Sequence, residues 1–418
     1  MCYHGDLFPL WLCPHEEMRR CLIRNCSATG TTESDVITPW NVVSKGPRGI
    51  DYERVLSTFR SEKIVPSVLE RLQAATGRSP HHFFTRDIAF SHRDFEVILN
   101  EFSQGRKFYL YTGRGPSANS MHLGHAIPFM LTKHLQELFQ CPLVIQITDD
   151  EKILFRDIPM DKMEKMVANN IRDVLAFGFL PEKTFIFCNT TYFGSMYRTV
   201  LDIQRMFTGN MVKNTLGLQD SDNIGKFAFP ATQAAPAFVS AFPKVLPIRS
   251  PKVHCLIPCA IDQDPFFVLT RNVAERLKRC KPALLHTKFL PSLRGPTHKM
   301  SSSAEERDVI LLSDTDAEVR RKMKSAFSGG QPTLELLKER GADLGVDVAF
   351  QMMNVFCSDD LLLSRVAEDY RSGKITSGDM KTLASDTIIR EVLHPWRERR
   401  ASLTDLEVEK FSLERSIF

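Results

Sequence analysis

The chain has 418 residues, too many for one ordinary domain, so two or three domains are expected. Hydrophobic residues make up 43% of the chain and charged residues 25%, as in soluble globular proteins, and no apolar run approaches the roughly 20 residues that a membrane helix needs. The net charge of +4 permits nucleic-acid binding without demanding it.

The N-terminal 34 residues differ in texture from the rest of the chain. Six cysteines and histidines crowd the first 26 positions: Cys2, His4, Cys13, His15, Cys21 and Cys26. A zinc knuckle would use these side chains, but their spacing fits no compact pair-and-pair zinc pattern, so a flexible tail is the favoured interpretation. Arg19, Arg20 and Arg24 leave an organelle-targeting segment open as a weaker alternative.

Residues 35–105 are expected to form an extension that packs on the domain after them. Residues 27–38 are rich in Ser and Thr, as a linker would be. The stretch from Ile64 to Ala75 predicts a helix, because Val68, Leu69 and Leu72 share one face. A second helix is predicted from Phe95 to Phe102.

Residues 106–315 alternate strand-like and helix-like segments. The apolar runs "KFYLYTG", "PLVIQIT", "TFIFC", "CLIPCAI" and "DVILLS" (308–313) predict buried strands. Amphipathic stretches from Gly124 to Phe139 and from Met163 to Phe177 predict helices between them. This alternation predicts an α/β domain with a doubly wound, Rossmann-type parallel sheet. Cysteines in these apolar runs favour buried thiols over disulfides.

The C-terminal part contains no strong strand pattern. Residues 316–401 predict an all-helical domain, and residues 402–418 a C-terminal helix. Basic runs occur in "VRRKMKSAF" and "HPWRERRA". Each run is explained equally well by contact with RNA or by a solvated helix face.

The stretch "SANSMHLGHAIPF" lies between the first strand of the sheet and its helix. A helix N-terminus has free N–H groups and a partial positive charge, which favour phosphate. His122 and His125 add ring donors, and Gly124 has no Cβ, so a flat base could lie against the backbone. We therefore expect a nucleoside triphosphate here, although two histidines exposed by chance would give the same pattern.

A second stretch, "THKMSSS", covers Thr297–Ser303. Lys299 is a long cation, and the three serines supply hydroxyl and backbone donors. Such a loop can close on a pyrophosphate and neutralise charge as it develops. An ordinary polar surface loop is the alternative.

Together the two motifs resemble those of the class I aminoacyl-tRNA synthetases. Longer stretches, among them "FYLYTGRGPSANSMHLGHAIPF", "PLVIQITDDEK", "CLIPCAIDQDPFF" and "HKMSSS", are similar to the eukaryotic cytosolic tryptophanyl-tRNA synthetases. The resemblance runs from about Asp35 to the C-terminus and leaves out the first 34 residues. Departures are small: Leu123 stands where the signature often has Ile or Val, and Ser302 where many relatives have Ala.

The resemblance implies an ATP site. Its ATP-binding positions are Arg114, His122, Gly124, His125, Lys299, Met300, Ser301, Ser302 and Ser303. Of these, His122, His125, Lys299, Ser301 and Ser302 would act in catalysis. ATP would enter with Mg²⁺ as a substrate, and no metal held by protein ligands is expected. Arg114 taken alone would more often be a surface arginine.

The resemblance also implies an amino-acid site. Tyr111 and Gln146 fall on positions that meet the indole N–H, and Glu151, Gln233 and Gln263 on positions that hold the α-amino group. The residue types agree, because Gln146 is a polar group inside an apolar strand and is costly unless it forms hydrogen bonds. A core glutamine, a solvated Glu151 and a simply packed Tyr111 remain the alternatives.

The resemblance further implies ATP-dependent activation of L-tryptophan and its transfer to tRNA(Trp) in the cytoplasm. It implies a helical anticodon-binding domain over residues 316–401, a homodimer and no membrane. Two rival interpretations are a different nucleotidyltransferase with the same histidine motif and a non-catalytic, tRNA-binding relative. The KMSSS loop and the long helical region argue against the first rival. The intact His122, His125 and Lys299 argue against the second.

Overall fold

The computed structural model describes residues 35–418 except residues 41, 157, 249, 251 and 303. The cysteine–histidine cluster, the expected tail and the N-terminal arginines lie outside the described residues, and so does Ser303 of the KMSSS motif.

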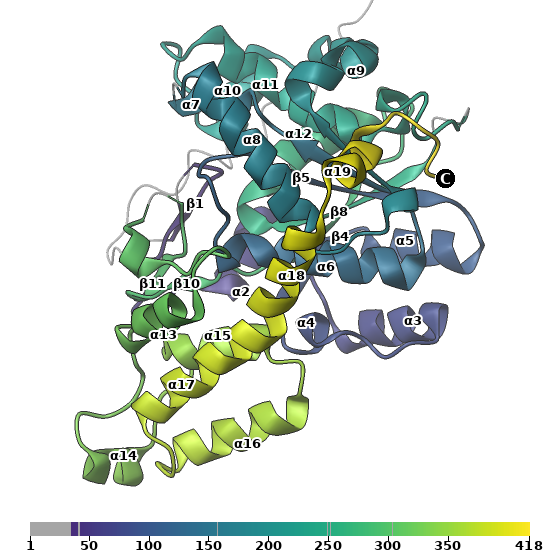
Figure 1. Ribbon diagram of the computed structural model, residues 1–418. Helices are drawn as coiled ribbons and strands as arrows, with labels where there is room; N and C mark the ends of the chain where they lie inside the picture. Colours follow the sequence, from purple (N-terminus) through teal and green to yellow (C-terminus); the bar gives the residue numbers. More distant parts are fainter. Residues whose placement is uncertain (1–34, 41, 157, 249, 251, 303) are drawn as a thin grey trace, which may run out of the picture. The chain divides into compact units, whose positions relative to one another are not determined.

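A seven-stranded sheet forms the centre, with the strand order β3-β4-β9-β8-β5-β6-β7. Figure 1 labels its strands β4, β5 and β8. Its strands are β3 (Glu62–Lys63), β4 (Ala89–Arg93), β5 (Phe108–Arg114), β6 (Leu143–Ile147), β7 (Thr184–Cys188), β8 (His254–Ala260) and β9 (Ala283–Thr287). The five strands from β9 to β7 are parallel, whereas β3 and β4 join one edge in antiparallel pairs. The predicted doubly wound α/β fold is confirmed, with a mixed edge made by residues before 106.

Side chains of β5 alternate between two cores. Phe108 and Leu110 belong to one buried cluster, and Tyr109 and Tyr111 to the other. Successive residues of a strand point to opposite faces, so both faces of the sheet are covered, as in parallel sheets generally. One face carries α3 (Pro66–Thr76), α5 (Phe95–Ser103), α6 (Leu123–Phe139) and α8 (Met160–Leu175). The other carries α9 (Asn189–Gln204), α11 (Ile224–Ala234) and α12 (Asp264–Ala274).

A second sheet contains the start of the KMSSS motif. Its order is β1-β2-β11-β10, from β1 (Val36–Ile37), β2 (Val42–Val43), β10 (Pro291–Ser292) and β11 (Gly295–Lys299). His298 of β11 pairs with Val43 of β2, so the N-terminal extension holds the strand that carries Lys299. Four short helices complete this half: α2 (Tyr52–Phe59), α4 (His82–Thr85), α7 (Glu151–Arg156) and α10 (Gly209–Leu216).

The C-terminal region is helical, as predicted. It contains α13 (Asp316–Lys324), α14 (Leu334–Arg340), α15 (Val348–Phe356), α16 (Asp360–Arg371), α17 (Ser377–Ile388), a π-helical turn (Ile389–Leu393), α18 (His394–Ser402) and α19 (Asp405–Ser412). The segments α17, the π-helical turn and α18 follow one another without a break and are drawn as one long rod in Figure 1. After α19 the chain is extended, and Ile417 is buried against the sheet core.

The predicted strand over residues 308–313 is wrong. This segment begins in a single 3-10 turn, Glu306–Asp308, and makes one isolated bridge, between Leu311 and His122. It turns back at once, because the Leu311 N–H donates to the Asp314 carboxylate at 2.9 Å. The segment therefore forms backbone hydrogen bonds with the start of α6 instead of adding a strand to the sheet.

Candidate active site

A cavity opens where the parallel strands end. From β5 the chain adds β6 and β7 on one side of the sheet, and then β8 and β9 on the other side. Ligands of open α/β sheets bind at such a switch point, which here lies between β5 and β8. Eleven predicted site residues line the cavity: Arg114, His122, Gly124, His125, Glu151, Gln233, Gln263, Lys299, Met300, Ser301 and Ser302. Tyr111 and Gln146 do not line it. The structure thus brings both sequence motifs to one place.

The two histidines sit at the N-terminus of α6. Their rings stack with centroids 3.5 Å apart, and the His122 N–H donates to Nδ1 of His125. His122 is buried, and neither of its ring nitrogens has a hydrogen-bond partner among the described residues. Burial lowers the pKa of His122 to about 3 and that of His125 well below its usual value. Both rings are therefore neutral at pH 7 and can offer N–H donors, but no charge.

Gly124 joins the two motifs. A Cβ at this position would lie 3.1 Å from the His122 ring and 3.6 Å from Cβ of Met300. The Ser117 hydroxyl lies 3.1 Å from the Ser302 hydroxyl, a second contact between the α6 entry and the KMSSS loop. The glycine leaves room for the His122 ring beside the loop that carries Met300.

Lys299 already has an anionic partner. Its Nζ lies 2.9 Å from Oδ2 of Asp262 and 5.0 Å from the ring centre of Phe289. Asp262 is buried in the turn after β8, and the sequence reasoning missed it. Its signal was an acidic residue directly after an apolar strand. A ligand phosphate would have to draw Lys299 away from this carboxylate.

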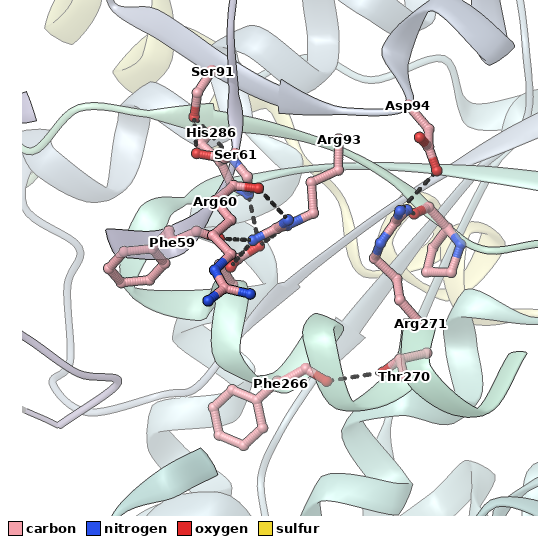
Figure 2. A network of polar contacts seen from close by, with 12 residues as sticks. Phe59, Arg60, Ser61, Ser91, Arg93, Asp94, Phe266, Thr270, Arg271 and His286 are labelled. Carbon is pink, nitrogen blue, oxygen red and sulfur yellow. Dashed lines mark hydrogen bonds and ion pairs between the residues drawn. The ribbon is translucent and has the colours of Figure 1, made fainter. Parts of the chain in front are cut away.

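A buried network fixes the turn that carries Asp262 and Gln263. Asp264 accepts two hydrogen bonds from Arg93, at 2.7 and 2.8 Å, and lies 3.1 Å from Nε2 of His286, whose Nδ1 lies 2.9 Å from the Ser91 hydroxyl. Figure 2 shows Arg93 reaching the backbone of Phe59 and Arg60 as well. Burial alone would raise the pKa of Asp264, but its bonds to Arg93 and His286 hold that pKa at about 2. The N-terminal extension is thereby anchored beside the cavity.

Arg114 is held at the end of β5 by a residue of α8. Its Nε donates to Oδ1 of Asn170 at 3.0 Å, while its buried Nη2 has no partner in the described part of the chain. Burial lowers the pKa of Arg114 to about 10, and the charges of Glu151 and Asp173 oppose that shift. The guanidinium stays charged at pH 7 with one donor edge unused. Sequence reasoning missed Asn170, whose only signal is a polar side chain among the apolar positions of α8.

Tyr111 and Gln146 meet behind the cavity wall. Their strands pair in parallel, with Gly113 opposite Gln146, and this pairing brings the two side chains together. The Tyr111 hydroxyl reaches Oε1 of Gln146 at 2.5 Å and the Gln233 carbonyl at 2.9 Å. The Gln146 amide donates to Asn189 at 2.7 Å. The acceptor that we expected to meet an indole N–H is thus occupied by Tyr111 in this structure.

The three residues expected at the α-amino group face the cavity from different elements. Glu151 opens α7, pairs with Lys152 and accepts a hydrogen bond from Thr148 at 2.9 Å. A Cβ on Gly115 would lie 2.2 Å from the Glu151 carboxylate, so a larger residue at this position would force the Glu151 side chain to shift. Gln233 comes from α11 and Gln263 from the turn after β8.

The basic runs of the helical region are largely committed to the protein itself. Lys322 is buried against Asp314 at 2.8 Å. Arg397 bonds Asp316 at 2.6 Å, and Arg400 bonds Asp173 at 2.6 Å. Lys322 is buried, whereas Arg397 and Arg400 remain partly exposed beside their carboxylate partners.

Comparison with known proteins identifies the class. A family model described as "tRNA synthetases class I (W and Y)" matches residues 103–392. The chain belongs to this family of class I tRNA synthetases.

The relatives narrow the family further. The chain is 47% identical to the cytoplasmic tryptophan–tRNA ligase of Schizosaccharomyces pombe, covering 84% of this chain and 90% of the relative. It is 43% identical to the ligase of the same name from Homo sapiens, covering 92% and 82% respectively. The solved tryptophanyl-tRNA synthetase of Plasmodium falciparum matches with a TM-score of 0.81 at 39% identity, covering 87% of this chain and 95% of that one. The expected group, the tryptophan–tRNA ligases of the cytosolic type, is confirmed.

Proposed function

We propose that the cavity activates L-tryptophan with ATP and that the chain then transfers the tryptophanyl group to the 3′ adenosine of tRNA(Trp). The observation that supports the ATP site is a set of buried nitrogens that have no hydrogen-bond partner among the described residues: Nη2 of Arg114 and both ring nitrogens of His122. Buried polar groups are costly when unpaired. His122 lies at the N-terminus of α6, where backbone N–H groups favour phosphate. Arg114 lines the same cavity, so a triphosphate would satisfy these nitrogens together.

The first step needs no general base. The tryptophan carboxylate attacks the α-phosphorus of ATP, a bond forms between carboxylate oxygen and phosphorus, and the bond to the β-phosphate oxygen breaks to release pyrophosphate. Catalysis then consists of alignment and stabilisation of charge. Arg114 and Lys299 supply positive charge, His122 and His125 supply neutral donors, and Ser301, Ser302 and Ser303 supply hydroxyls. Lys299 must leave Asp262 to reach the phosphates. Its contact with the pyrophosphate would then strengthen in the transition state, because negative charge moves to the leaving group.

The amino acid would bind on the side of the cavity nearest α7 and α11. Glu151, Gln233 and Gln263 would hold the α-ammonium group, with Glu151 exchanging Lys152 for the ligand. For Tyr111 and Gln146 to meet the indole N–H, the cavity wall in front of them must open and the Tyr111 hydroxyl must turn toward the Gln233 carbonyl. That carbonyl lies within its reach at 2.9 Å.

ATP would enter as its magnesium complex. The residues of the described ranges contain no group of three His, Cys, Asp or Glu side chains able to hold a metal. Magnesium is usually bound through substrate phosphates and waters with few protein ligands, so the triphosphate would provide much of its coordination. Mg²⁺ would neutralise phosphate charge that Arg114 and Lys299 do not reach.

The helical region, residues 316–401, would bind the anticodon, with residues 35–105 as an extension packed on the catalytic domain at 106–315. A homodimer is proposed in addition. Tyr197 and Leu201 lie one turn apart on α9 and are each 44% exposed, a surface that a second copy would cover. The cytoplasmic relatives support a cytosolic localisation of this protein. None of the helices that the structure describes is long and apolar enough to span a bilayer.

ATP–pyrophosphate exchange, measured with each of the twenty amino acids, tests this function. Exchange that depends on tryptophan is the expected result. Exchange driven by another amino acid would reassign the substrate, and no exchange with any of them would favour a non-catalytic relative.

A further inference from the structure

Helix α8 fixes the position of Arg114 and of the loop that follows it. Asn170 is fully buried. Its oxygen accepts the Arg114 Nε hydrogen bond at 3.0 Å, and its amide nitrogen donates to the Ala118 carbonyl at 2.9 Å and to the Met166 carbonyl at 2.8 Å. Ala118 precedes the histidine motif by four residues. One side chain of α8 thus holds both the guanidinium and the backbone that leads to His122.

Helix α18 also contacts α8, at Asp173. Asp173 lies three residues after Asn170, so the two side chains are neighbours on the helix surface. Its buried carboxylate accepts from Arg400 Nε at 2.6 Å, and its carbonyl accepts from the buried Trp396 indole at 2.9 Å. Both partners belong to α18.

Helix α18 is the end of a rod that begins inside the helical region. The rod continues without a break from α17 through the π-helical turn to α18 (Figure 1). At about 1.5 Å per residue it spans roughly 40 Å. Its first half is packed in the helical core through Met380, Ala384 and Ile388, and its second half ends on α8. A displacement of the helical region would therefore move Asp173 and its helix.

We propose that Asn170 and Asp173 are positioning residues that couple the helical region to the nucleotide site: Arg400 and Trp396 set the position of α8, and Asn170 passes that position to Arg114. The coupling rests on the proposed function, because it gives Arg114 the phosphates of ATP as its ligand. Displacement of a positioned group by 1 Å can cost about a hundredfold in rate, so small shifts of α8 suffice.

The test compares full-length variants by calorimetric ATP binding and by the KM for tryptophan in pyrophosphate exchange. Arg400→Ala should weaken ATP binding about tenfold, as expected of a mutation that changes coupling between two sites by about 1.4 kcal/mol, and leave the KM for tryptophan unchanged. Arg400→Lys keeps the charge and should restore most of the affinity. Arg390→Ala is the matched control, because Arg390 lies on the same rod and its guanidinium bonds the adjacent Glu391 instead of α8.

A double variant decides whether the effect travels through Asn170. Asn170→Ser should weaken ATP binding on its own, and adding Arg400→Ala should weaken it little more, because residues that act through one another are not additive. Unchanged ATP affinity in Arg400→Ala, or losses that multiply in the double variant, would overturn the proposal. If Arg400→Ala proves unfolded by thermal denaturation, Asp173→Asn replaces it. Binding of ATP without tryptophan-dependent exchange would refute the proposed function alone, while the affinity comparison would still decide the coupling.

Discussion

The ammonium group of Lys299 lies 2.9 Å from the carboxylate of Asp262, so the motif lysine is paired with an acidic residue of the same chain. The two residues come from different elements, the end of β11 and the turn after β8. Their side chains are 22% and 9% exposed, so the pair is only partly screened by water. The lysine must exchange this carboxylate for a phosphate before it can take part in the reaction.

Removing the competing charge should favour the nucleotide. Asp262→Asn should tighten ATP binding by up to roughly fivefold, because a partly exposed ion pair is worth about 1 kcal/mol at most. Equilibrium binding of ATP to the wild type and the variant measures the effect. Weaker binding in the variant would mean that Asp262 supports the nucleotide site instead of competing for Lys299.

Gln146 should determine preference for the amino acid rather than affinity for ATP. Gln146→Ala should narrow the tryptophan-to-phenylalanine ratio of kcat/KM, because phenylalanine leaves the glutamine oxygen unpaired at a cost of about 1–3 kcal/mol. The ratio comes from exchange kinetics with the two amino acids.

Tyr111→Phe is the companion variant, because it removes the hydroxyl that occupies the Gln146 oxygen in this structure. It should keep the preference for tryptophan. Loss of ATP affinity with unchanged amino-acid ratios in Gln146→Ala would place the indole pocket elsewhere.

The buried His122 should make the protein sensitive to acid. Its pKa is about 3 in the folded chain and about 6.5 when unfolded. Between these values only the unfolded state takes up the proton. Stability is therefore fully present above pH 6.5 and falls as the pH drops toward 3, by about 1.4 kcal/mol per pH unit at most. His122→Asn should flatten this slope in denaturation midpoints measured from pH 7 to 4; an identical slope would show that the ring does not remain neutral.

The buried Arg93–Asp264 pair should carry stability. Arg93→Met leaves the Asp264 carboxylate, 1% exposed, without its main partner, and breaking such a pair costs about 3–5 kcal/mol. Urea denaturation measures this loss. Lys63→Met is the control. Lys63 lies on the neighbouring strand β3 and forms an exposed ion pair with Glu53 of α2, so its loss should change stability little. Equal effects in the two variants would deny the network its anchoring role.

Strong local patterns made much of the fold predictable. The apolar runs at β5, β6, β7 and β8 and the period of α6 were sufficient to identify the doubly wound sheet, and the two motifs located its active edge. The strand β9 was missed because "ALLHT" is short and follows a lysine and a proline. Residues 308–313 look like a strand, but their pairing partner, the backbone around His122, is nearly 190 residues away and could not be inferred.

The contacts that tune the site were harder to predict. Asp262 and Asn170 are polar residues whose roles arise only when distant elements meet, at Lys299 and at Arg114 respectively. The neutral state of His122 depends on burial, which a motif does not reveal. Arg400 lies in a basic run, and only the fold places it on Asp173 instead of on RNA.

Single-turnover formation of tryptophanyl-adenylate by the wild type and by Lys299→Ala decides whether this cavity is the site of tryptophan activation. The wild type should form the adenylate from tryptophan and ATP. Loss of one charged contact made in the transition state should slow the variant by about 2.7–4 kcal/mol, roughly a hundredfold to a thousandfold. Its tryptophan affinity should stay nearly unchanged, because Lys299 faces the phosphates. An unchanged rate in the variant, or no adenylate from the wild type, would contradict the assignment of this cavity as the site of tryptophan activation.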